Sequence, residues 1–106
     1  MKIEVLPDYA EPYWATFTIG TPNLIIVSNA IMHLELANIF VDPNERNNGY
    51  GTILMICALE WARGQQLDKL KGIYHPSGNI IKTKQWYSDI GATVEGKWVK
   101  GDVNNM

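Results

Sequence analysis

The spacing of apolar residues changes near residue 43 from that of strands to that of a helix, and this change limits the folds available to the chain. Before it, segment 13–19 is rich in aromatic and β-branched residues and alternates between two sets of side chains, as strands do. A turn-forming Gly-Thr-Pro-Asn segment then precedes an apolar run at 24–27, which is expected to return as an antiparallel partner. A longer strand is expected over about 32–41, because the proline at position 43 cannot continue a ladder.

Beyond this point the period is that of a helix. Apolar residues at positions 50, 53, 54, 57, 58 and 61 share one helical face, and Gly64 stands where a C-terminal cap is expected. A strand over 70–74, a helix over 80–90 and a strand over 93–99 complete the pattern. The order β-β-β-α-β-α-β predicts an α+β fold with a mixed α/β sheet, in which helices pack on a central sheet.

Length and composition exclude several classes of protein. The 106 residues suffice for one domain, 1–106, which no linker or repeat divides. The formal net charge of −2 disfavours nonspecific nucleic-acid binding, because that binding needs a basic excess. The single cysteine, Cys57, fits a reducing compartment and is expected in the core. With no signal peptide and no long apolar run, a cytoplasmic protein without membrane contact is expected.

A glycine-containing turn joins the third expected strand directly to the first helix. Gly49 and Gly51 permit backbone angles that other residues avoid, and successive N–H groups at such a turn can converge on one anion. The positive end of the helix dipole and Arg46 would help to bind a pyrophosphate there. The spacing matches neither common nucleotide loop. A flexible connection that needs glycine only for the turn is the alternative.

This turn resembles the Arg/Gln-x-x-Gly-x-Gly/Ala signature of the GNAT superfamily of N-acetyltransferases, here Arg46-Asn47-Asn48-Gly49-Tyr50-Gly51. The family's Val-x-Pro strand end stands before it as Val41-Asp42-Pro43, and its aromatic-Tyr pair followed by Gly is similar to 86–91. The resemblance covers roughly residues 32–99. It implies the GNAT-like acyl-CoA N-acyltransferase fold, with a mostly antiparallel central sheet and two main helices.

The resemblance further implies an enzyme that moves an acetyl group from acetyl-CoA to a primary amine of a protein, peptide or small molecule. A reduced GNAT-fold module that binds CoA or a protein partner without turnover is the alternative. The resemblance places the pyrophosphate on backbone amides after Arg46 and the pantetheine arm along the preceding strand edge. The residues expected to bind the coenzyme are Ile39, Phe40, Val41, Arg46, Asn47, Asn48, Gly49, Tyr50, Gly51, Thr52 and Asn79.

Two side chains are candidates for proton transfer. An amine with a pKa of about 10.4 must lose a proton before it attacks, and a carboxylate can remove it. Glu35 is the candidate base: similar family members have a glutamate at this place, and simple alternation puts Glu35 on one face with Ile39 and Val41. An ordinary exposed strand glutamate is the alternative. Tyr87 matches the family's tyrosine that protonates the departing thiolate, and a packing tyrosine is the alternative.

Several weaker indications complete the list. Family members often have an asparagine seven residues before this tyrosine; here Ile80 stands there, so Asn79 either contacts the coenzyme or caps a helix. A backbone N–H near Ile39 would meet the developing oxyanion. His33 and His75 lack metal-ligand spacing, so no metal site is expected, although His75 could assist proton transfer.

The segment before the first hairpin is short. Most relatives carry a strand and two helices there, whereas about a dozen residues precede Tyr13. The acceptor side is therefore expected to be open. An open side suits a bulky amine, or a second subunit that would make a homodimer.

Overall fold

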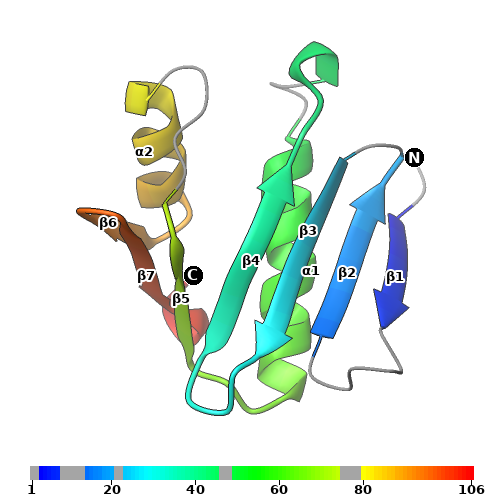
Figure 1. Ribbon diagram of the computed structural model, residues 1–106, viewed down its shortest axis with the longest axis vertical. Coiled ribbons are helices and arrows are strands. Elements are labelled where there is room, and N and C mark those ends of the chain that lie inside the picture. Colours follow the sequence, from blue (N-terminus) through cyan, green and yellow to red (C-terminus); the bar gives the residue numbers. More distant parts are fainter. Residues whose placement is uncertain (1–2, 8–13, 21–22, 46–48, 75–79) are drawn as a thin grey trace.

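A computed structural model describes residues 3–7, 14–20, 23–45, 49–74 and 80–106. They form one seven-stranded sheet in the order β1-β2-β3-β4-β5-β7-β6 (Figure 1). The strands are β1 (Ile3–Pro7), β2 (Trp14–Ile19), β3 (Asn23–Asn29), β4 (Leu34–Phe40), β5 (Lys69–Ile73), β6 (Ala92–Glu95) and β7 (Trp98–Asp102). The helices are α1 (Tyr50–Gly64) and α2 (Ile80–Asp89), with short 3-10 turns η1 (Pro43–Glu45) and η2 (Val103–Asn105).

The predicted α+β architecture is confirmed. Strands β1 to β4 pair antiparallel in chain order, and α1 carries the chain from β4 to the parallel strand β5. Two details of the prediction are wrong. An additional strand, β1, pairs with β2, and the single strand expected at 93–99 is the hairpin of β6 and β7. Gly96 has φ +59°, which lets the chain reverse between two strands that alternate too briefly to be separated in the sequence.

Helix α1 forms where its apolar period predicts, and it packs against β2 and β3. Its buried residues are Leu54, Met55, Ala58, Leu59 and Ala62. The expected cap at Gly64 is wrong, because Gly64 is the last helical residue. The left-handed residue is Gln66, with φ 62°, and the N–H of Leu67 donates to the carbonyl of Ala62 at 2.9 Å.

The two faces of the sheet differ in composition. One face carries the core, which includes Val27, Leu34 and Val99, and both α1 and Tyr87 of α2 contribute to it. The other face, here called the open face, has no helix from the described residues in front of β2, β3 and β4 (Figure 1). On the open face Trp14, Phe40 and Ile73 are exposed by 36%, 41% and 45%.

A β-bulge interrupts the alternation of β4. Ile26 of β3 pairs with Asn38, whereas the next residue, Val27, pairs with Leu36, so Ala37 has no partner on β3. The extra residue shifts the side-chain alternation by one. Glu35 therefore shares the open face with Asn38 and Phe40, whereas Ile39 packs against the core. The expectation that Glu35, Ile39 and Val41 share a face is wrong for this reason.

Strands β4 and β5 stay together for only three residue pairs. The last pair is Leu36 with Gly72, and beyond it the strands separate toward the start of α1 (Figure 1). A Cβ atom at Gly72 would lie 2.8 Å from the Cβ of Leu36 and 2.9 Å from its carbonyl oxygen. Only glycine permits this approach. The close contact therefore fixes the point at which the two strands part.

We expect Gly72→Ala to lower the free energy of unfolding by about 1–3 kcal/mol, because the added methyl group forces β4 and β5 apart. Gly64→Ala is the matched control: nothing lies within 4 Å of its Cβ position. In a helix that change should raise stability by about 0.5–1 kcal/mol. Urea unfolding of both variants measures the difference. Equal stabilities would contradict the close-contact argument.

Candidate functional site

The candidate site begins where β4 loses its partner. From Ala37 onward no residue of β4 pairs with β5, so the backbone groups on this edge have no strand partner there within the described residues. The predicted arm-binding residues lie here: Ile39 is half-buried against the core, Phe40 is exposed, and Val41 packs on the core side. Such an edge can accept an extended ligand as an added strand.

A buried amide fixes the chain as it leaves β4. Asn23, at the start of β3, is fully buried, and its Oδ1 accepts the N–H of Asp42 at 2.6 Å. Its Nδ2 donates to the carboxylate of Glu45 in η1. One side chain thus holds both ends of 42–45. Asn23 belongs to a turn-forming segment of the sequence, and no pattern in the chain distinguishes a buried amide from an exposed one.

The glycine turn ends at the N-terminus of α1. Gly49 has φ 78° and ψ 9°, the left-handed conformation expected of it, and its carbonyl accepts the N–H of Ile53 at 3.0 Å. No side chain caps this end of the helix among the described residues. The first-turn amides of Tyr50, Gly51 and Thr52 are therefore available to an anion. Arg46, Asn47, Asn48 and Asn79 lie outside the described residues.

Helix α2 reaches this turn through one tryptophan. The indole N–H of Trp86 donates to Oγ1 of Thr52 at 3.0 Å. The ring lies against Gly51, where an added Cβ would be 3.5 Å from the indole and 3.8 Å from Val41. The contact links α2 to the first turn of α1.

Tyr87 lies beside this link but points into the core. Its side chain is 5% exposed, and its ring makes edge contacts with Tyr74 and Trp86 at centroid distances of 6.1 and 4.9 Å. Burial, with a smaller contribution from Tyr74, raises the pKa of Tyr87 to about 12. Tyr87 therefore keeps its proton at neutral pH.

Glu35 lies on the open face, opposite Ser28 of β3 and Lys71 of β5. Its Oε2 is 2.7 Å from Nε2 of His33. From the sequence, His33 is a candidate only for metal binding, which its spacing disfavours. The signal that could have revealed this pair is the spacing of two residues on a strand, which puts both side chains on one face.

The structure brings the strand edge, the glycine turn and Trp86 together, whereas Glu35 lies further back along β4, and Tyr87 is buried. Cys57 is half-buried and unpaired by any disulfide. No three histidine, cysteine or acidic side chains gather as a metal site among the described residues. In that same part of the chain, neither helix has the length and apolar character needed to cross a membrane.

A model of the acetyltransferase (GNAT) family matches residues 14–79, which is more than half of the chain. The chain belongs to the GNAT family. No curated protein sequence is detectably similar to it.

Solved structures of other GNAT proteins share the fold. Nourseothricin acetyltransferase is 22% identical with a TM-score of 0.74, and the match covers 94% of this chain and 70% of that one. An aminoglycoside 6'-N-acetyltransferase solved with coenzyme A is 12% identical with a TM-score of 0.72, covering 89% and 75%. A Klebsiella pneumoniae protein assigned as an acyl-CoA N-acyltransferase has a TM-score of 0.75 at 12% identity, covering 96% and 97%. The last of these is a GNAT fold of nearly the same length.

We expect Asn23→Ala to lower the free energy of unfolding of this GNAT domain by about 2–3 kcal/mol. The change removes the buried amide that accepts the N–H of Asp42 and donates to the Glu45 carboxylate. Asn44→Ala, an exposed asparagine of the same segment, is the control and should change stability by less than about 0.5 kcal/mol. Denaturant unfolding compares them, and similar losses in both variants would refute the anchoring role.

The raised pKa of Tyr87 predicts a loss of stability at high pH. The unfolded tyrosine ionises near its ordinary value of 10.0 and the folded one near 12, so the fold is favoured below pH 10 and this contribution is lost as pH rises through 12. The full difference is about 2–3 kcal/mol. Unfolding measured from pH 8 to 12 should show a smaller loss in Tyr87→Phe than in the parent. An equal loss in the two proteins would contradict this prediction.

Proposed function

We propose that this GNAT protein transfers an acetyl group from acetyl-CoA to a primary amine. The observation that carries the proposal is the edge of β4, which has no strand partner after Leu36 in the described residues. It leads to the N-terminus of α1, which no described side chain caps. A pantetheine arm is extended and carries amides, so it suits a strand edge. A pyrophosphate suits the amides of a helix N-terminus.

The residues present fit this ligand. The edge at Ile39, Phe40 and Val41 would bind the arm, and the amides from Gly49 to Thr52 would bind the pyrophosphate. Arg46, Asn47, Asn48 and Asn79 are predicted to add contacts. When bound, acetyl-CoA supplies the acetyl group as a thioester.

Glu35 is the proposed base that removes the proton of the acceptor amine. It lies on the open face, half-exposed, where an amine can approach without displacing the core. The exposed Trp14, Phe40 and Ile73 of that face favour a bulky acceptor or a second copy of the chain over a small polar amine. The names of two relatives, a nourseothricin and an aminoglycoside acetyltransferase, also support an amine acceptor.

Tyr87 is the proposed hydrogen-bond donor to the departing sulfur. Its pKa of about 12 lies above the 8.5 or so of a thiol, so the phenol chiefly offers a hydrogen bond to the thiolate. Its burial favours a second candidate function, a coenzyme-binding module without turnover. The two candidates differ in whether coenzyme A is released.

We expect acetyl-CoA to stabilise the protein by about 2.7 kcal/mol at one hundred times its dissociation constant, seen as a thermal shift. We expect release of free thiol with a panel of primary amines. Glu35→Gln should lower turnover by about 100-fold or more and preserve the thermal shift, because it removes only the base. The control Glu95→Gln alters an exposed glutamate that pairs with Lys100 on the second hairpin, and it should retain both properties.

The outcomes separate the candidates. A thermal shift without thiol release from any amine would favour the binding module. The absence of any shift would overturn both candidates.

A further inference from the structure

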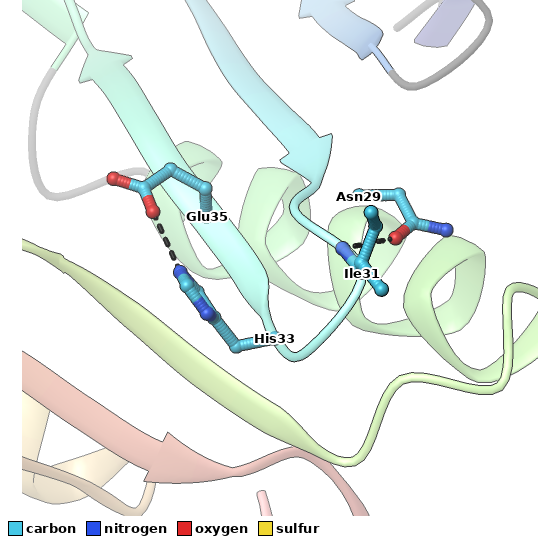
Figure 2. Close-up of polar contacts among 4 residues, drawn as sticks. All are labelled: Asn29, Ile31, His33 and Glu35. Atoms are coloured by element: carbon cyan, nitrogen blue, oxygen red, sulfur yellow. Dashed lines mark hydrogen bonds and ion pairs between the residues drawn. The ribbon is translucent and has the colours of Figure 1, made fainter.

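A histidine that the proposed reaction does not use lies against its proposed base. Figure 2 shows the His33 ring meeting one carboxylate oxygen of Glu35, while the second oxygen points away from the ring. The bonded atoms, Nε2 and Oε2, are 2.7 Å apart. The side chains are 25% and 37% exposed, so solvent weakens this contact less than it would weaken a fully exposed pair.

Glu35 lies beside a lysine in the strand register, but its carboxylate contacts His33. Lys71 of β5 is the register partner of Glu35, but its Nζ lies 4.6 Å from the ring centroid of Trp98. A lysine bound to Glu35 would hold a permanent positive charge there and make the carboxylate a weaker base. An imidazole can donate the same hydrogen bond while neutral.

A constrained turn sets the position of His33. Ile31 has φ 72°, which is a genuine outlier for a β-branched residue, and it is exposed. Asn29 accepts the N–H of Ile31 on its Oδ1 at 2.8 Å (Figure 2), and the carbonyl of His33 accepts the N–H of Ala30 at 3.0 Å. Strain held by local hydrogen bonds is common beside functional groups. Here the strained residue lies two positions before the histidine.

We infer that His33 is a positioning residue for Glu35, donating its Nε2–H to Oε2 so that Oε1 is free to take the proton of the acceptor amine. The inference rests on the proposed function. The step is a proton transfer only: the ammonium N–H bond breaks, an O–H bond forms on Oε1, and the proton later leaves to solvent. The His33–Glu35 hydrogen bond is kept throughout.

The test compares side chains at position 33 that differ in whether they carry an N–H donor and in how far that donor lies from the backbone. His33→Ala removes the donor and should lower kcat by about tenfold or more with little change in KM for acetyl-CoA, because a misoriented group slows the chemical step. His33→Gln carries an amide N–H about as far from the backbone as Nε2 of histidine, and it should recover most of the lost kcat. His33→Asn places its amide nearer the backbone and should not. Lys71→Gln is the control and should behave as the parent.

A second readout does not depend on turnover. In a nuclear magnetic resonance spectrum of the protein without ligand, the hydrogen-bonded Nε2 proton of His33 should be visible. It should be lost in Glu35→Ala and kept in Lys71→Gln.

The results distinguish this inference from the proposed function. A parent protein that releases coenzyme A, together with a fully active His33→Ala, overturns the role of His33 and leaves the function standing. A folded His33→Gln no better than His33→Ala also overturns it, as does a rate loss in Lys71→Gln alone. A parent protein without turnover overturns the proposed transfer reaction and this inference with it.

Discussion

The approach of Gly72 to Leu36 determines where the sheet divides. Up to this pair β4 and β5 form a normal parallel ladder, and beyond it β4 continues without β5. The bulge at Ala37 falls at the same level, so the side chains of β4 change face just where its edge becomes unpaired. The exposed backbone edge of β4 and the orientation of its side chains are thus both set at the level of Leu36 and Ala37.

Because of this geometry, the two faces of the sheet have different roles. The core face carries Ile39 and Val41 and receives α1, so the residues that support the glycine turn also stabilise the fold. The open face carries the ionisable side chains His33 and Glu35, which need no apolar contact. Substitutions of His33 or Glu35 on the open face are therefore expected to change the free energy of unfolding little. Substitutions at the glycine turn are expected to change both the free energy of unfolding and ligand binding.

The fold was predictable where a long pattern specified it. The apolar stripe of α1 and the glycine turn before it span enough residues to be recognised, and the GNAT signature adds the expected strand edge. The β6–β7 hairpin was missed because each strand is too short to show its own period. The bulge, the burial of Asn23 and the link between Trp86 and Thr52 were missed because they depend on contacts between distant segments, which alternation and spacing do not encode.

The position of β7 has a consequence for assembly. β7 follows β6 in the chain yet lies between β5 and β6, and it is the only strand that pairs with β6 in the described residues. During synthesis β6 has no neighbour to join until residue 102 has left the ribosome. Strand β6, which contacts α2, is therefore expected to find its partner later in synthesis than the strands of the β1 to β4 hairpins.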